Sequence, residues 1–285
     1  MRPVCLPALF VFGLLATACD SAPGPEGSDF NLIVAVGDTL REARVRVPAG
    51  LTASQPAHLL IALHGSNDTG PNFKAGSKLD EAGTDDMIIA YPTAAKGNWA
   101  EGCNCNIADR LQIDDLGFMS ALIDSISTVY NISRERTYAM GFSQGGLFAY
   151  RLGCVMGRDF TAVAAVSAPM SKPLSESCSP GTAASVLTLH GREDRVLPWT
   201  GSDNGAWSLL SAPETTLFWS HALQCDRPAT EETVTSGDAR LKSTRYQGCR
   251  GGTRVTLLEM PEGEHAWYTR DPDGRDLVMD FFLRR

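Results

Sequence analysis

Short, continuous apolar runs alternate along this chain with longer segments whose apolar residues recur every three or four positions. The runs have the length and uniform hydrophobicity of strands buried on both faces of a sheet, and they lie at 57–63, 87–91, 137–140, 162–167 and 186–189. The longer segments have the spacing of amphipathic helices and lie at 72–82, 116–130, 145–156, 215–223 and 276–283. This alternation predicts an α/β fold with a mostly parallel, doubly wound sheet and helices on both of its faces.

Further strands are expected on either side of this alternating core. They form an opening hairpin and two late strands, at 31–36, 42–47, 243–247 and 253–259. We expect a long loop at 93–114, and we expect Asp115 to cap the helix that follows it. Together these elements predict a single domain that extends from residue 30 to residue 285.

The start of the chain has the pattern of an export signal. Met1 and Arg2 are followed by an apolar stretch that is too short to cross a bilayer as a stable anchor, so residues 1–18 are predicted to be a signal peptide. The small residues before Cys19 resemble a bacterial lipobox, which predicts a lipid anchor at Cys19 and a periplasmic or cell-surface lipoprotein. A plain signal peptide and a secreted protein are the alternative. Residues 19–29, rich in Pro and Gly, are expected to be a flexible tether.

The charge balance narrows the range of partners. The chain has 33 acidic and 25 basic residues, a net charge of −8, and its sequence shows no basic stripe. A nucleic acid partner is therefore not expected. Contact with a membrane is expected only through the predicted lipid anchor.

Six cysteines follow Cys19, and in an exported protein they predict disulfides. Spacing alone does not fix the pairing, because six cysteines allow 15 combinations. Cys103 and Cys105 are separated by one residue, and three states remain open for them: a bond to each other, reduced thiols, or a bound ligand. No Cys-x-x-Cys pair and no His-Cys cluster indicates zinc, so no metal site is expected.

One motif carries a candidate nucleophile. Gly141-Phe142-Ser143-Gln144-Gly145 matches G-x-S-x-G, with a predicted strand before it and a predicted helix after it. That context is required of a nucleophile elbow, in which a sharp turn exposes the serine hydroxyl. The alternative is an ordinary Gly-rich turn with a serine that has no catalytic role.

A serine nucleophile needs a base, and chain order selects His265. In a sheet of this type the order is serine, acid, histidine, and His265 lies in a loop directly after a predicted late strand. The other histidines precede the serine, precede any candidate acid or lie within a predicted helix: His58, His64, His190 and His221.

The same chain order places the acid in the loop that follows residues 186–189. Asp194 is favoured there, and Glu193 is the alternative. An oxyanion also needs two N–H donors. Gln144, directly after the serine, is expected to supply one backbone N–H, and Ser66, after the first buried strand, the other.

Several segments together resemble the secreted esterase family that includes polyhydroxybutyrate depolymerases and feruloyl esterases, a group similar to carbohydrate esterase family 1. The similarity extends from about residue 59 to the C-terminus, and its segments are Leu63–Ser66, Asp114–Phe118, Gly141–Gly145 with Ala149–Cys154, His190–Asp194 with Val196–Pro198, and Gly263–Trp267. The resemblance implies an α/β-hydrolase fold and a triad of Ser143, Asp194 and His265. It also implies two disulfides, Cys154–Cys178 and Cys225–Cys249.

We therefore predict an exported serine carboxylesterase that forms an acyl-enzyme and uses no cofactor. Expected substrates are short acyl or hydroxyalkanoate esters, or feruloyl and acetyl groups on polysaccharide. Trp99, Trp199 and Trp267 lie beside the proposed loops and are candidates to line the substrate pocket, with ordinary packing as the alternative. A peptidase or acyltransferase on the same fold is a second hypothesis. A non-catalytic binding lipoprotein is a third, and the intact triad argues against it.

Overall fold

The computed structural model describes residues 27–181, 184–204 and 207–284. The predicted signal peptide, Cys19 and most of the predicted tether lie outside these residues. The first strand begins at Asp29, one residue before the predicted start of the domain. No helix in the described part of the chain is long and apolar enough to cross a membrane.

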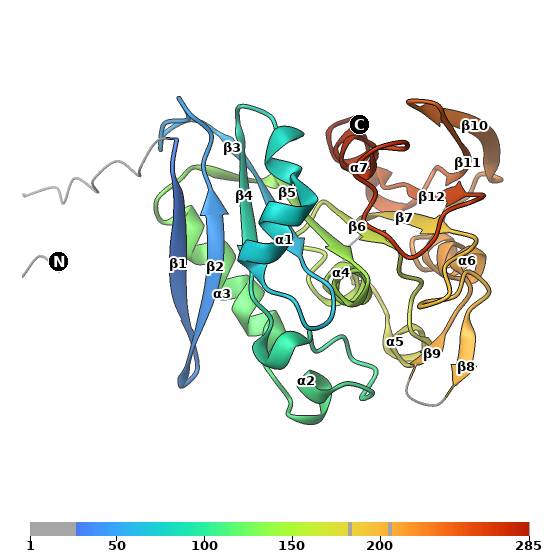
Figure 1. Ribbon diagram of the computed structural model, residues 1–285, viewed down its shortest axis with the longest axis horizontal. Coiled ribbons are helices and arrows are strands. Elements are labelled where there is room, and N and C mark those ends of the chain that lie inside the picture. Colours follow the sequence, from blue (N-terminus) through green and yellow to red (C-terminus); the bar gives the residue numbers. More distant parts are fainter. Residues whose placement is uncertain (1–26, 182–183, 205–206, 285) are drawn as a thin grey trace, which may run out of the picture.

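A ten-stranded sheet with the order β1-β2-β4-β3-β5-β6-β7-β12-β11-β10 forms the centre of the molecule (Figure 1). Its strands are β1 (Asp29–Val36), β2 (Thr39–Arg46), β3 (Ala57–Leu63), β4 (Met87–Pro92), β5 (Ile132–Phe142), β6 (Ala162–Val166), β7 (Ser185–Gly191), β10 (Thr230–Ser236), β11 (Ala239–Tyr246) and β12 (Val255–Met260). The strands from β4 to β12 in the sheet order are parallel, and antiparallel strands flank them on both sides. A small separate hairpin pairs β8 (Ser202–Asn204) with β9 (Trp207–Leu209).

Helices cover both faces of this sheet. The α-helices are α1 (Gly70–Ser77), α2 (Ile107–Arg110), α3 (Asp115–Ser127), α4 (Gln144–Val155), α5 (Lys172–Ser177), α6 (Ala212–Ala222) and α7 (Gly274–Leu283), and the 3-10 turns are η1 (Leu79–Glu81), η2 (Ala95–Gly97) and η3 (Arg250–Gly252). Apolar residues of α3, α4 and α6 form one core cluster with the sheet. Residues of α1, η1 and α7 form a second cluster on the opposite face. The predicted α/β-hydrolase architecture, with one domain and two helical layers, is therefore present.

The buried strands agree best with their predicted positions, because each is a continuous apolar run with no exposed face. The helix cap was predicted one residue too late. Asp114, not Asp115, caps α3 by accepting a 2.7 Å hydrogen bond from the Gly117 N–H. Asp115 is instead the first residue of the helix, where its carboxylate binds the Arg41 guanidinium at 2.7 Å and the Ala100 N–H at 2.7 Å.

The edge strand β10 was not predicted. Its sequence, Thr-Glu-Glu-Thr-Val-Thr-Ser, is almost entirely polar and mostly exposed, so it lacks the apolar pattern of the inner strands. β10 pairs with β11 and forms one edge of the sheet. A charged edge of this kind discourages further strand addition.

Three disulfides are present among the described residues. Cys154 is bonded to Cys178 and Cys225 to Cys249, which are the two pairs that the family resemblance implied. The third bond joins Cys103 to Cys105 and decides the pairing that the sequence left open. Figure 1 shows that the helix preceding Cys225, α6, and the strand following Cys249, β12, belong to the same end of the molecule.

The Cys225–Cys249 bond is expected to stabilise the C-terminal part of the sheet. It closes a loop with a sequence separation of 24 residues, so the double variant Cys225→Ala/Cys249→Ala should lose about 3 kcal/mol of unfolding free energy on a chain-entropy estimate. The melting temperature, followed by circular dichroism, should fall by roughly 10 °C. Val155→Ala removes an exposed side chain and serves as the control that leaves the melting temperature unchanged. An unaltered melting temperature in the double variant would contradict the stabilising role.

Candidate active site

Ser143 occupies the turn between β5 and α4. Its backbone has φ 54° and ψ −123°, a conformation that is strained for a residue with a side chain. The strain is held by hydrogen bonds on both sides: the Ser143 N–H donates to the Val166 carbonyl at 2.9 Å, and its own carbonyl accepts from the Gly146 N–H at 2.8 Å. The turn places the Ser143 side chain at the N-terminus of α4, where N–H groups have no partner within the helix.

Close packing around this turn explains the two glycines of the motif. A Cβ atom on Gly141 would lie 2.1 Å from the Gly145 carbonyl, and a Cβ atom on Gly145 would lie 2.5 Å from the carbonyl oxygens of Leu63 and His64. Both distances are far below van der Waals contact. The helix can therefore approach the ends of β3 and β5 only because these positions lack side chains.

Ser143, His265 and Asp194 lie in one chain of hydrogen bonds. His265 Nε2 is 3.0 Å from Ser143 Oγ, and His265 Nδ1 is 2.7 Å from Asp194 Oδ2. The Asp194 side chain is fully buried and that of His265 is 15% exposed. The three residues come from the ends of β5, β7 and β12, which lie close together in the sheet.

In the loop after β7, the contacts favour Asp194 over Glu193 as the partner of His265. Asp194 Oδ1 accepts the N–H groups of Val196 at 2.9 Å and Leu197 at 2.8 Å, whereas Glu193 is exposed. Burial raises the Asp194 pKa, but the hydrogen bonds from His265 and from the Leu197 N–H together outweigh it, and the pKa lies below its ordinary value. The carboxylate is therefore ionised at neutral pH.

Two other histidines are structural supports. Burial lowers the His190 pKa to about 4, so the neutral ring donates its Nε2 hydrogen to the Leu197 carbonyl at 3.0 Å. His64 is fully buried, and burial lowers its pKa as well. Its Nε2 accepts the Ala94 N–H at 3.0 Å, so Nδ1 carries the hydrogen and donates to the Gly65 carbonyl at 2.7 Å.

Hydrogen bonds also hold the loop that carries His265. The buried Ser167 hydroxyl donates to the Ala266 carbonyl at 2.9 Å. One residue further along, the Trp267 indole N–H donates to the Ser77 carbonyl at 3.0 Å and its ring meets Phe73 edge-on. Sequence reasoning missed Ser167, because nothing in its residue type or spacing distinguishes it from other strand-end serines.

Gln144 is locked to the long loop that precedes α3. Its side-chain amide accepts the Trp99 N–H at 2.9 Å and donates to the Trp99 carbonyl at 2.6 Å. The buried Trp99 ring stacks on Phe148 and its indole N–H donates to the His64 carbonyl at 3.0 Å. Gln144 therefore fixes this loop with its side chain, and its backbone N–H begins the helix.

A cavity of about 390 Å³ opens beside Ser143. Ser66 and Gln144 line it with Ser143, and Trp207 and Leu209 of β9 lie among its apolar wall residues. Sequence reasoning missed Trp207, which is partly buried. In the sequence, Trp207 was marked only as an aromatic residue in the segment after Asp194.

The three tryptophans proposed from the sequence have packing contacts instead. Trp99 is fully buried against Phe148, and Trp199 packs in a small cluster under the Arg192 guanidinium. Trp267 holds the loop that carries His265 through its bond to Ser77. Among the described residues that line the cavity, none is one of these three tryptophans. Their position near loop ends reflects packing of those loops.

Comparison with known proteins identifies a matching family and several similar proteins. A family model described as "Putative esterase" matches residues 38–209. Feruloyl esterase B of Piromyces equi is 26% identical over 258 residues, which cover 85% of this chain but 46% of that protein, so the chain spans less than half of that relative's length. Feruloyl esterase C of Emericella nidulans is 29% identical over 210 residues, covering 70% of this chain and 73% of that protein.

Solved structures show the same fold. The acetyl xylan esterase from Aspergillus awamori matches with a TM-score of 0.61 at 14% sequence identity, over 89% of this chain and 98% of that chain. The sheet order, the strand-to-helix turn at Ser143 and this likeness define the protein as an α/β hydrolase. The chain belongs to the esterase family whose model it matches, and it is a carboxylic ester hydrolase.

The hydrogen-bond geometry leads to a test of the acid. Asp194→Asn removes the charge that faces His265 while keeping the size of the side chain, and we expect kcat for p-nitrophenyl acetate to fall by about 10⁴-fold. Glu193→Gln is the matched control and should retain activity within about twofold, because its side chain is exposed. Strong loss in Glu193→Gln with an active Asp194→Asn would place the acid one residue earlier.

Proposed function

We propose that the protein is an exported serine esterase in which Ser143, His265 and Asp194 form the catalytic triad. The observation that carries this proposal is the continuous chain of hydrogen bonds from Ser143 Oγ through His265 to the buried Asp194 carboxylate. A serine hydroxyl is a weak nucleophile at neutral pH and needs such a base and an orienting acid.

The reaction follows from these contacts. His265 Nε2 takes the proton of Ser143 Oγ as the oxygen attacks the ester carbonyl carbon. The C–O bond to the alcohol then breaks, and His265 returns the proton to the leaving alcohol, which leaves an acyl group on Ser143. Water then attacks the acyl-enzyme while His265 takes its proton. The acyl C–O bond to Ser143 breaks, His265 returns the proton to Ser143 Oγ, and the carboxylic acid product is released. Asp194 holds the imidazole in the tautomer with the hydrogen on Nδ1 and stabilises the imidazolium.

The oxyanion of each tetrahedral intermediate needs donors that are already in place. We assign these donors to the backbone N–H groups of Gln144 and Ser66. Gln144 is the first residue of α4, so its N–H has no acceptor within the helix. Ser66 follows Gly65, whose added Cβ would lie 3.3 Å from the Ser143 Cβ, and both Ser66 and Gln144 line the cavity beside Ser143.

The proposed substrates are feruloyl or acetyl esters carried by a polysaccharide. The relatives named above are feruloyl esterases, and the similar structure is an acetyl xylan esterase. The cavity supports an aromatic or short acyl group, because Trp207, Leu209 and Pro198 give it apolar lining beside the reactive serine. Hydroxyalkanoate esters, the other class expected from the sequence, are tested in the same assay.

Export completes the proposal. The predicted signal peptide and Cys19 would place the mature protein outside the cytoplasm, tethered by residues 19–29, and the three disulfides are consistent with an oxidising compartment.

Replacing the nucleophile tests the mechanism. Ser143→Ala should lower kcat on the order of 10⁴-fold or more while leaving the circular dichroism spectrum unchanged. The variant and wild type are compared on p-nitrophenyl acetate, methyl ferulate, acetylated xylan and hydroxybutyrate oligomers. Near-wild-type hydrolysis by Ser143→Ala would refute the mechanism. Wild-type activity on p-nitrophenyl acetate and hydroxybutyrate oligomers, with none on ferulate or xylan, would refute the substrate class alone.

The lipid anchor has a separate test. In a bacterial host with lipoprotein processing, the full-length chain should fractionate with membranes, and Cys19→Ser should move to the soluble exported fraction, because it removes the acylated thiol. Cys5→Ser, which changes a cysteine inside the predicted signal, is the matched control. Identical partitioning of Cys19→Ser and wild type would favour an ordinary signal peptide.

A further inference from the structure

A positive charge lines the cavity beside Ser143 and has no part in the mechanism described above. The cavity has a volume of about 390 Å³, and Arg195, which is exposed, is the one charged residue among the described residues that line it. No acidic side chain is among these lining residues. The chain as a whole has a net charge of −8, so a cation without an acid beside the reactive serine is contrary to the overall charge. Such a cavity attracts a negatively charged group.

Arg195 differs from the other arginine of the same loop in having no acidic partner. Arg192 forms an ion pair with Glu259 at 2.8 Å, and its guanidinium lies over the Trp199 ring. Within the described ranges, Arg195 forms no ion pair and no side-chain hydrogen bond. A guanidinium has five N–H donors in a planar arrangement that matches a carboxylate. The donors of Arg195 are therefore available to a ligand, whereas Arg192 is already engaged.

The backbone on either side of Arg195 is held in place. Asp194 precedes it, and Asp194 Oδ1 accepts the N–H groups of the two residues that follow it, Val196 at 2.9 Å and Leu197 at 2.8 Å. The Leu197 carbonyl also accepts a hydrogen bond from His190 Nε2 at 3.0 Å. Arg195 thus belongs to the turn that carries the proposed catalytic acid, and a fixed backbone reduces the entropy lost when its side chain binds a ligand.

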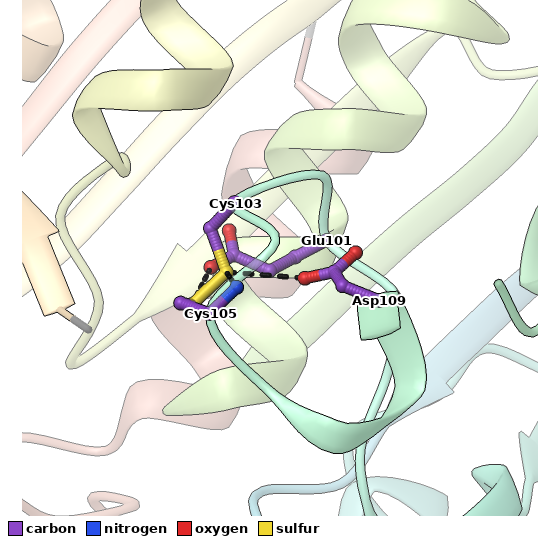
Figure 2. Close-up of side chains that lie close together, drawn as sticks. All are labelled: Glu101, Cys103, Cys105 and Asp109. Carbon is purple, nitrogen blue, oxygen red and sulfur yellow. Dashed lines mark hydrogen bonds between the residues drawn. A yellow bond between two sulfur atoms is a disulfide. The ribbon is translucent and has the colours of Figure 1, made fainter. Parts of the chain in front are cut away.

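The β9 wall of the cavity is held as well, and it adds little negative charge. Ser171 forms an antiparallel bridge with Leu209, and its hydroxyl donates to Glu101 Oε2 at 3.1 Å. Figure 2 shows Glu101 beside the Cys103–Cys105 disulfide. Burial raises the Glu101 pKa to about 8, so this carboxyl group is largely protonated at pH 7.

We propose that Arg195 binds a carboxylate of the substrate, so that the preferred esters carry a carboxylate close to the bond that is hydrolysed. This inference rests on the proposed function, because it assigns a ligand group to the cavity in which Ser143 is the nucleophile. A volume of about 390 Å³ lies near the lower end of the range for small-molecule sites. A carboxylate that reaches Arg195 must therefore lie within about one sugar or acyl unit of the ester at Ser143.

Two of the ester classes named above can supply this carboxylate. A polysaccharide that contains uronic acids carries one on the sugar, and a short hydroxyalkanoate oligomer carries one on its last unit. Both present a planar anion that accepts two parallel N–H bonds from a guanidinium. Val196, next to Arg195, lines the same cavity and is 65% exposed, so the carboxylate meets the guanidinium beside apolar surface, where their attraction is stronger than in open water.

Matched pairs of esters test the charge. The first pair is an acetylated methyl glucuronoside and the corresponding acetylated methyl glucoside, and the second is a hydroxybutyrate dimer and its C-terminal amide. For at least one pair, wild-type protein should have a kcat/KM about fivefold higher for the charged member. The difference should lie mainly in KM, because the carboxylate is remote from the bond that reacts. Raising the salt concentration should reduce the preference. The pair that shows it identifies the source of the carboxylate.

Variants of the two arginines assign the preference to one side chain. Arg195→Gln should bring the ratio of the two kcat/KM values to about one. Arg195→Lys should keep part of the preference, because an ammonium retains the charge but lacks the planar pair of donors. Arg192→Gln, which removes the arginine paired with Glu259, is the matched control that keeps it. The inference is overturned if wild type shows no preference in either pair, or if Arg195→Gln retains the preference.

Binding to Ser143→Ala separates this inference from the esterase proposal. Calorimetry with the same pairs should show tighter binding of the charged member to Ser143→Ala, and Ser143→Ala/Arg195→Gln should bind that member about fivefold more weakly. If wild type hydrolyses neither member but this binding preference is present, the esterase proposal is refuted and the carboxylate site is supported. If wild type hydrolyses both members of each pair with equal kcat/KM, the carboxylate site alone is refuted.

Discussion

The close approach of α4 to the ends of β3 and β5 is the constraint on which the rest of the site depends. It brings Gly145 so close to the carbonyl oxygens of Leu63 and His64 that a Cβ atom on Gly145 would lie only 2.5 Å from each of them. Because the helix is held so near the sheet, the chain must turn sharply at Ser143, which directly precedes the first residue of α4. The strained backbone at this serine is stabilised by packing and hydrogen bonds that extend well beyond the turn.

The same helix start also holds the long loop before α3. The Gln144 side chain bonds both backbone groups of Trp99, and the Trp99 indole bonds the His64 carbonyl. The side of the site that we propose binds the oxyanion is thus built from two loops that brace each other. The Cys103–Cys105 disulfide follows Trp99 closely in sequence, so it lies in a segment that is already held by contacts with Gln144 and His64.

How much the sequence predicts depends on the physical origin of each feature. Buried parallel strands are continuous apolar runs, so their positions and the fold class can be predicted, and chain order then selects Ser143, Asp194 and His265 for one site. The polar edge strand β10 has no such pattern. Asp115 fails as a cap because Arg41, distant in sequence, engages its carboxylate. The Cys103–Cys105 disulfide escapes prediction because six cysteines allow 15 pairings, and only the geometry of the folded loop brings these two sulfurs together.

The sequence predicts which three residues meet at Ser143 but not which residues line the cavity beside it. The physical origin of the two features explains this difference as well. His265 lies 122 residues from Ser143 and 71 from Asp194 in sequence, yet all three meet because parallel strands bring their carboxyl ends to one edge of the sheet. Topology alone therefore brings the three proposed catalytic residues together. The cavity wall depends on how individual loop side chains pack: Trp267 turns to Ser77 and anchors the histidine loop, while Trp207 of β9 lines the space beside Ser143. In this fold the sheet determines where the proposed catalytic residues meet, and the loops determine the shape of the cavity beside Ser143.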